Sequence, residues 1–405
     1  MESLLPFFLA LAILIAVAKA SGYLAIRFKQ PAVFGELLVG VILGPTVLNM
    51  LGWPAFSGFH LEETFGYLAN LGVLFLMFIA GLEVDIEAMV ESGRASVLSG
   101  AFGALAPLIL APPAMALFGY DLRHGIFIGL ILAATSTSIS AQTLMELGVL
   151  RTRVGTVLMG SAVVDDILVI LFLSLFTALT MGGGGGTVAV LLVLARIVLF
   201  MVVALFVGMR IIPKLVIWVE RLPISQSLLS LVVVMVLLYS WAAEALGGMA
   251  SITGAFVAGL AFARTGHHRR IESAMSTLSY SWLVPVFFVS IGLDTNARIL
   301  GLSGIPFALV LVLLAILTKI AGCGLGARLG GCTLSEARAV GVGMVSRGEV
   351  GLIIATVGLS TGLIGQGVYA ASVIVVLVTT VITPVMLRAL YPRTPTTVTQ
   401  PVSGS

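Results

Sequence analysis

Charged residues are scarce in this chain. Asp, Glu, Lys and Arg together account for 10% of the 405 residues, while 59% are hydrophobic. Soluble globular domains have about a quarter of their residues charged, so this composition excludes that class and indicates a protein embedded in lipid. The formal net charge is +3, and the basic residues are spread over short loops. Without one basic patch, nucleic-acid binding is excluded as well.

Cysteine is nearly absent too. The two cysteines, Cys323 and Cys332, lie in or beside one hydrophobic segment and have no His or Cys neighbours at the spacing of a metal site. This excludes a disulfide framework and a cysteine-ligated metal, so we expect both residues to be structural. We expect no enzymatic activity and no bound cofactor.

Hydrophobic runs long enough to cross about 30 Å of hydrocarbon recur along the whole chain. The first run ends in Ala18-Lys19-Ala20, which resembles a signal-peptidase site, but the acidic start before it favours a retained helix. We predict an all-α membrane protein of about thirteen transmembrane helices, without an inserted soluble domain. The predicted spans are 4–25, 31–51, 66–84, 95–117, 124–145, 153–180, 188–212, 225–246, 250–263, 276–293, 305–329, 336–360 and 367–391.

The Lys and Arg residues of the loops are distributed unevenly. If the N-terminus lies outside, nearly all of them fall on the inner side, and only Arg123 and Arg298 fall on the outer side. The positive-inside rule therefore predicts an outer N-terminus and an inner C-terminus in the cytoplasmic membrane. The inner loops include His267 and His268 beside Arg264. A histidine pair can respond to pH, although a loop that only fixes the topology is the simpler interpretation.

The two halves of the chain repeat one another weakly. At an offset of 211 residues, Ala-Gly-Leu-Glu at 80–83 falls on Ile-Gly-Leu-Asp at 291–294, and at an offset of 219 Gly40 falls on Gly259. These matches order the spans as six, one linker and six. An odd linker turns the second set over, so we predict an inverted-topology repeat of the kind found in secondary transporters.

Two spans are predicted to be broken. Residues 134–138, Ala-Thr-Ser-Thr-Ser, put hydroxyl side chains in mid-membrane, and residues 341–351 are rich in glycine. Both compositions are poor helix formers. The offset of 211 places Ser136 on Arg347, so the repeat predicts two broken helices that cross. Unwound backbone would offer free N–H and C=O groups to charges.

Five charged residues lie at mid-depth: Asp165, Asp166, Lys319, Arg347 and Glu349. Inserting a charged side chain at the centre of a span costs about 2.5–3.5 kcal/mol, so each of these residues is expected to have a partner or a function. Lys319 needs one of the two Asp residues, while the other, about 100° further round the helix, can face a cavity. Arg347 and Glu349 could satisfy each other or the broken-helix ends. The alternative is an inert polar network that only fixes helix packing.

The acidic pair suggests a cation site. A hard monovalent cation takes oxygen ligands, and these could come from Asp165, Asp166, Thr135 and Ser136. Desolvation and a neighbouring carboxylate both favour the protonated acid, so a proton can compete with the cation. One site with two exclusive occupants is the basis of an antiporter.

Several motifs together resemble the second cation:proton antiporter family, which shares the broad fold of the NhaA sodium/proton antiporter. The resemblance covers nearly the whole chain, and the acidic pair, the lysine and Arg-Gly-Glu in that order are its most specific features. The matching stretches are 30–45, 75–83, 146–150, the Asp165-Asp166 pair, Lys319 and 347–352. Two departures are Ser346, where similar relatives often have proline, and the rich hydroxyl run at 135–138.

The resemblance implies roles for these residues. It implies that Asp166 is the essential carboxylate for cation and proton, and that Asp165 pairs with Lys319. It further implies a homodimer without cofactor, in which a core moves against a scaffold. The corresponding ranges are 1–94 and 213–300 for the scaffold, 95–181 and 301–391 for the core, 187–212 for the linker helix and 392–405 for the tail. Because no nucleotide-binding regulatory domain follows, Na⁺ is favoured over K⁺.

Other functions remain open at this level. A K⁺/H⁺ antiporter, a sodium-coupled symporter of an organic solute or a channel-like protein could share these features. A symporter would not need a lysine paired with a midplane Asp. The expected function is electrogenic exchange of Na⁺ for protons by elevator-type alternating access.

Overall fold

The structure is a computed structural model and describes residues 4–57, 61–83, 91–180, 186–221, 223–293, 296–300 and 304–391. Throughout these ranges the regular elements are helices. In the first half they are α1 Leu4–Arg27, α2 Ala32–Leu43, η1 Met50–Gly52, α3 Leu61–Glu83, α5 Gly93–Ala116, α6 Leu122–Ala133, α7 Thr137–Glu146, α8 Arg153–Thr180, α9 Gly186–Arg210 and α10 Ile212–Glu220. In the second half they are α11 Ser227–Ala242, η2 Ala243–Gly247, α12 Ser251–Ala263, α13 His268–Leu278, η3 Ser279–Leu283, α14 Val284–Leu293, η4 Ala297–Leu300, α15 Ile305–Leu329, α16 Leu334–Gly343, α17 Glu349–Ser360 and α18 Gln366–Leu390.

The helices are those of an integral membrane protein. Within the described residues, 10 helical segments are long and apolar enough to cross a membrane. Shorter apolar helices occur at Ala32–Leu43, Ser251–Ala263 and Val350–Leu359. The all-helical, membrane-embedded class is therefore confirmed, whereas the count of thirteen spans stays a prediction.

The second predicted span is shorter than expected. We placed it at 31–51, but α2 ends at Leu43 and Gly44 adopts an extended conformation. Pro45 explains the difference, because the residue before a proline is disfavoured in the helical region. The remaining residues form turns and the short η1 helix. The helix here is thus a 12-residue segment, which contacts Glu146 of α7 at its start and approaches Gly292 of α14 just past its end.

Two other helices are interrupted where the sequence predicted it. Residues 134–136 separate α6 from α7, with extended backbone at Ala134 and Ser136. Residues 344–348 separate α16 from α17. At the crossing, the Ser136 N–H donates to the Ser346 carbonyl at 2.9 Å. The two breaks therefore meet, at Ser136 and at the residue before Arg347.

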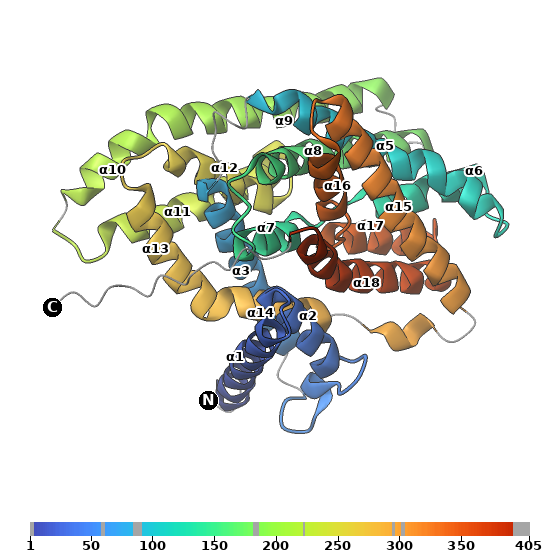
Figure 1. The fold of residues 1–405 in the computed structure, drawn as a ribbon, viewed down its shortest axis with the longest axis horizontal. Coiled ribbons are helices and arrows are strands. Elements are labelled where there is room, and N and C mark those ends of the chain that lie inside the picture. Colours follow the sequence, from blue (N-terminus) through green and yellow to red (C-terminus); the bar gives the residue numbers. More distant parts are fainter. Residues whose placement is uncertain are drawn as a thin grey trace.

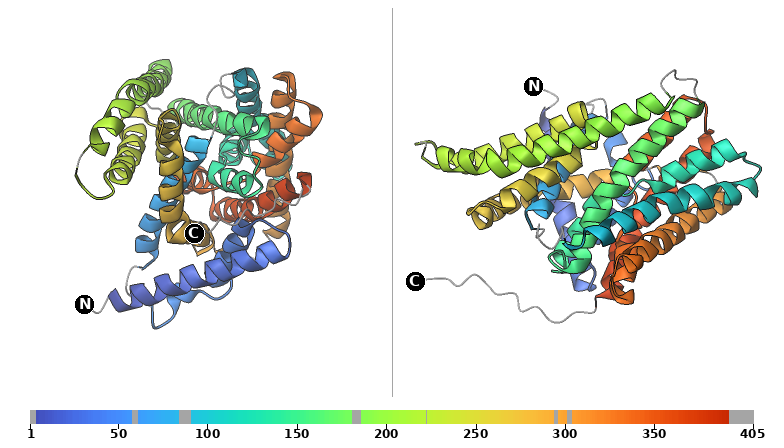
Figure 2. Two further views of the ribbon diagram at one scale, coloured as in Figure 1. Left: turned by 60° about the vertical axis from the view of Figure 1, so that its left-hand side comes forward. Right: turned by 90° about the horizontal axis from the view of Figure 1, so that it is seen from above.

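The helices form separate groups (Figure 1). α5, α6 and α15–α18 gather at one end of the molecule, α10, α11 and α13 lie at the other, α9 runs along the top of this view, and α1, α2 and α14 lie below. The first group has its own apolar core, to which α6 contributes Phe127, α15 contributes Leu311 and α17 contributes Ala355. The view from above shows α8 crossing obliquely between the two ends (Figure 2). Polar residues on α8 can consequently contact helices at both ends of the molecule.

Two close helix crossings depend on glycine. A Cβ atom on Gly40 of α2 would clash with the Val289 carbonyl of α14, and one on Gly259 of α12 would clash with the Phe78 carbonyl of α3. Only glycine lets the backbones approach this closely. The crossings join α2 to α14 and α12 to α3.

Candidate functional site

The centre of the site is an ion pair between α8 and α15. Lys319 Nζ lies 2.6 Å from Asp165 Oδ1, and both side chains are fully buried. The Thr135 hydroxyl donates to Asp165 Oδ2 at 2.7 Å from the break between α6 and α7. Both oxygens of Asp165 are thus bound. Of the two partners that the sequence left open for Lys319, the structure places Asp165 against it.

Gly103 on α5 makes room for this pair. A Cβ atom there would clash with Cys323 Sγ and would lie 3.6 Å from Lys319 Nζ and 3.7 Å from Asp165 Oδ1. Any side chain at 103 would therefore fill the space between α5 and the ion pair. Cys323 is fully buried beside it and Cys332 is buried as well; both are free thiols. The sequence did not single out Gly103, because a glycine in an apolar helix gives no signal of what it approaches.

Asp166 has different surroundings. It is 9% exposed, whereas its neighbour Asp165 is 0% exposed. The Thr253 hydroxyl of α12 donates to Asp166 Oδ2 at 3.3 Å. The two adjacent carboxylates therefore face different helices, as the 100° turn between successive residues requires.

Ser136 does not reach either carboxylate in the described contacts. Its hydroxyl lies 3.2 Å from the hydroxyl of Ser138, and its carbonyl accepts a 2.6 Å hydrogen bond from the Ser346 hydroxyl. Ser140 joins the same network through Ser346 Oγ at 3.1 Å. Ser346, the departure noted in the sequence, thus ties the two broken helices together with a hydroxyl that a proline would lack.

Arg347 satisfies the broken-helix ends. Its guanidinium donates to the carbonyls of Met344 and Val345, both at 3.1 Å, and of Ala315 at 3.0 Å. The residue is 1% exposed, so these carbonyls replace its water. The alternative pairing with Glu349 concerns a side chain outside the described part of the structure.

Two threonines of α18 hold the backbone of Arg347, and sequence reasoning missed them. The Arg347 N–H donates to Thr379 Oγ1 at 3.2 Å, and the Thr380 hydroxyl donates to the Arg347 carbonyl at 2.6 Å. Both threonines are buried. Their signal in the sequence is a pair of polar residues in an otherwise apolar span, which is weak because threonine commonly bonds its own helix.

A polar cavity lies between α2 and α7, away from the acidic pair. It has a volume of about 530 Å³, and its lining includes Lys19, Glu36, Glu146 and Arg388. Glu146 accepts hydrogen bonds from the backbone N–H groups of Ala32 at 2.5 Å and Val33 at 3.2 Å. Its carboxylate therefore caps the N-terminus of α2 from the last residue of α7.

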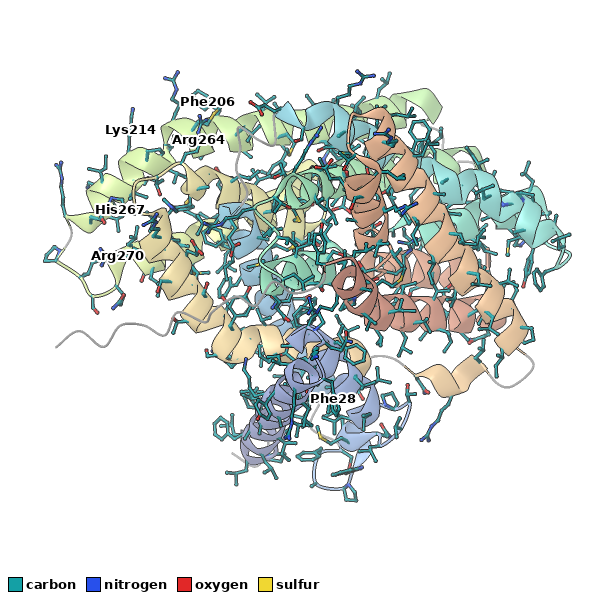
Figure 3. The ribbon with its side chains drawn as sticks, in the orientation of Figure 1. Phe28, Phe206, Lys214, Arg264, His267 and Arg270 are labelled. Atoms are coloured by element: carbon teal, nitrogen blue, oxygen red, sulfur yellow. The ribbon has the colours of Figure 1, made fainter. Side chains whose placement is uncertain are left out.

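The histidine cluster lies elsewhere. Figure 3 shows His267, Arg270, Arg264 and Lys214 at the end of the molecule formed by α10–α13. His267 Nδ1 is 3.0 Å from Glu220 Oε1, and Arg270 Nη1 is 3.7 Å from the same atom. These contacts join α10 to α13 at the surface. They do not involve the acidic pair.

Comparison with known proteins places this geometry in a family. The family described as "Sodium/hydrogen exchanger, transmembrane" matches residues 11–391. The Na⁺/H⁺-K⁺ antiporter GerN of Bacillus cereus is 39% identical over 385 residues, which are 95% of this chain and 96% of that protein. A Na⁺/H⁺ antiporter of Enterococcus hirae is 36% identical over 383 residues, covering 94% and 97%.

A solved structure shows the same fold. The sodium proton antiporter MjNhaP1 from Methanocaldococcus jannaschii superimposes with a TM-score of 0.66 at 21% identity, covering 96% of this chain and 97% of that chain. The family match extends over both broken helices and the Lys319–Asp165 pair. The chain therefore belongs to the transmembrane sodium/hydrogen exchanger family.

Proposed function

We propose that this protein is a secondary active transporter that exchanges Na⁺ for protons across the cytoplasmic membrane. Exchange of a monovalent cation for protons follows from the family and from antiporter relatives that match nearly the whole chain. Na⁺ is the finer proposal. The observation that best supports cation/proton exchange is the buried Lys319–Asp165 pair with a second carboxylate, Asp166, beside it. Na⁺ itself is supported by the relatives described as Na⁺/H⁺ antiporters.

In this proposal Asp166 takes either the cation or the proton. It retains some exposure, while Asp165 is held by Lys319 and Thr135. A cation needs the ionised carboxylate, and protonation removes that ligand, so the two occupants exclude each other. Asp165 and Thr135 lie beside this site, and together with Ser136, whose hydroxyl contacts Ser138 in this structure, they tune its affinity. Arg347 and Glu349 offset the ends of the broken helices.

We infer that transport moves a core against a scaffold, with 1–94 and 213–300 as the scaffold, 95–181 and 301–391 as the core and 187–212 as the linker. The separate apolar core of α6, α15 and α17 supports this division. Such an elevator-type movement would present one site alternately to the two sides, as inverted repeats allow.

Support for the inverted repeat comes from the two glycine crossings. Gly40 meets Val289, and Gly259 meets Phe78. The offset of 219 takes Gly40 to Gly259, and the offset of 211 takes Phe78 to Val289. Exchanging the two halves of the chain therefore maps the Gly40–Val289 crossing onto the Gly259–Phe78 crossing, as an inverted repeat requires.

A homodimer with an outer N-terminus and an inner C-terminus completes the proposal. The orientation is supported by the uneven distribution of Lys and Arg among the loops. The dimer is proposed from the family resemblance, with the scaffold helices at its interface.

K⁺/H⁺ exchange is the second candidate. It is favoured by one observation, the relative GerN of Bacillus cereus, whose name includes K⁺. The hydroxyl and carboxylate oxygens at the site can bind either hard monovalent cation.

Collapse of a pH gradient in proteoliposomes tests the proposal. The protein is reconstituted into acid-loaded vesicles, and NaCl, LiCl and KCl are added in turn while internal pH is followed. We expect the strongest response to Na⁺, and none from Asp166→Asn, since an amide neither ionises nor takes up a proton. Robust exchange by Asp166→Asn at matched protein level would remove Asp166 from the site, and a K⁺ response above the Na⁺ response would select the second candidate.

A further inference from the structure

We propose that Thr253 is a cation ligand and affinity-determining residue of the exchanger, supplied to Asp166 from the opposite side of the site. This deepens the proposed function and rests on it. Thr253 lies in the first turn of α12, within the proposed scaffold, while Asp166 lies on α8 of the proposed core. Its hydroxyl oxygen is 3.3 Å from Asp166 Oδ2.

The hydroxyls of the broken helix are engaged elsewhere. Thr135 donates to Asp165 at 2.7 Å, and Ser136 lies 3.2 Å from Ser138. Among the contacts that the structure describes, the hydroxyl on Asp166 thus comes from Thr253 and from neither Thr135 nor Ser136. Of the two hydroxyl ligands expected from the sequence, Thr135 therefore binds Asp165, one position away, and Ser136 contacts Ser138.

The chemistry of a threonine suits this place. A hydroxyl has one donor and two acceptor lone pairs. With the site empty, the O–H group donates to the carboxylate; with a cation on Asp166, the hydroxyl can rotate and offer a lone pair to the same cation. Thr253 is 3% exposed and Asp166 is 9% exposed, so little water is available to replace that oxygen. Loss of the Thr253 hydroxyl should consequently weaken binding of the cation.

The packing of α12 explains why Thr253 holds its position. A Cβ atom on the next residue, Gly254, would clash with the Tyr239 carbonyl of α11, and one on Gly259 would clash with Phe78 of α3. α12 is therefore closely packed against α11 and α3. A ligand on this helix meets Asp166 only while α8 lies alongside it, so the full set of oxygen ligands forms in this arrangement of the two parts.

The test is the Na⁺ dependence of proton release by Thr253→Val in proteoliposomes. Valine keeps the shape and removes the hydroxyl. We expect the Na⁺ concentration for half-maximal exchange to rise about three- to tenfold, the loss of one net hydrogen-bond-like contact, with the maximal rate changed little. Thr253→Ser, which restores the hydroxyl, should return the half-maximal concentration to near the original value.

Two comparisons separate binding from packing. Thr156→Val is the matched control, because Thr156 is buried on α8 but its hydroxyl donates to the carbonyl of Thr152, the residue just before that helix. It should leave the Na⁺ dependence unchanged. Thr135→Val should change it less than Thr253→Val does, because Lys319 still holds Asp165.

A second readout does not depend on turnover. Na⁺ that binds the folded protein raises its melting temperature, and this shift should be smaller in Thr253→Val than in Thr253→Ser at equal NaCl. If the valine variant does not fold, Thr253→Ala is judged by the same criterion. An unchanged half-maximal Na⁺ concentration together with an unchanged melting shift would overturn the role of Thr253. That result leaves the proposed function intact, which fails instead if Asp166→Asn exchanges Na⁺ for protons.

Discussion

Among single residues, Lys319 is the one whose loss should cost most stability. It is a fully buried amine 2.6 Å from a fully buried carboxylate. Removing one partner of such a pair leaves the other charge without compensation, which typically costs about 3–5 kcal/mol. We therefore expect Lys319→Met to lower the free energy of unfolding by about that amount, and Lys319→Met with Asp165→Asn to recover most of it. Thermal unfolding of the purified protein in detergent measures both.

Lys214→Met is the control for this comparison, because Lys214 is exposed on α10. It should melt like the unaltered protein. Equal melting of the single and double variants at the buried pair would contradict the prediction, since the cost would then come from packing around position 319 and not from an unpaired charge.

The residues of the site differed in how visible they were in the sequence. Asp165, Asp166 and Lys319 stand out because a charge within an apolar span is rare and costly. Thr253 and Gly103 did not, because Thr and Gly are ordinary in such spans and only the approach of another helix gives them a role. The charges alone left either Asp as the partner of Lys319, the family resemblance implied Asp165, and the structure places Asp165 there.

Among the elements, α2 depends on a residue far away in the chain. Pro31 provides no side-chain cap, and Glu146 of α7 accepts the N–H groups of Ala32 and Val33 instead. Glu146→Ala leaves these two donors without their acceptor, at a cost of about 1–3 kcal/mol. We expect faster hydrogen–deuterium exchange at the first turn of α2, measured by mass spectrometry, with little change in α12.

Glu272→Ala serves as the matched control in this experiment. Glu272 is also a carboxylate, but its partner is the exposed Arg151 at 3.1 Å. Its removal should leave exchange in α2 as it was. Protection of α2 that survives Glu146→Ala would show that the cap contributes little and that packing alone holds the helix start.

The elements were predicted well where composition alone decides them. The hydroxyl run and the glycine run predicted both helix breaks, because each disfavours the helix locally. The second span was predicted too long, since hydropathy continues past Leu43 while Pro45 ends the helix. Ser136, which the offset aligns with Arg347, hydrogen-bonds the preceding residue, Ser346. An offset between repeats gives the neighbourhood and not the hydrogen-bond register.

For the whole molecule, the charges at the site predict a response to voltage. Lys319 pairs with Asp165, and Asp166 adds a second acidic side chain beside that pair. If a cation on the acidic pair takes the place of Lys319 beside Asp165, and a proton leaves Lys319 in addition to the one that leaves Asp166, more than one proton moves per cation. We expect exchange in sealed vesicles to accelerate or slow with an imposed membrane potential according to its sign.

Asp165→Asn should weaken that response. The neutral amide cannot form an ion pair with Lys319 as the carboxylate does, so the transport cycle involves one charge fewer. Potassium gradients with valinomycin set the potential, and Na⁺-driven pH change is the readout, with vesicles lacking the protein as the control for leakage. Equal rates under potentials of either sign would place this protein among electroneutral exchangers.

The short helix α7 has one more consequence. Its 10 residues span about 15 Å, from the break beside Thr135 and Asp165 to Glu146 on the first turn of α2. Because α7 is a short, rigid helix, a displacement at its Thr135 end also moves its Glu146 end. The distance between two spectroscopic labels, one at the Glu146 end of α7 and one on α2, would therefore report on movement at the carboxylate pair. That pair is itself too deeply buried to be labelled.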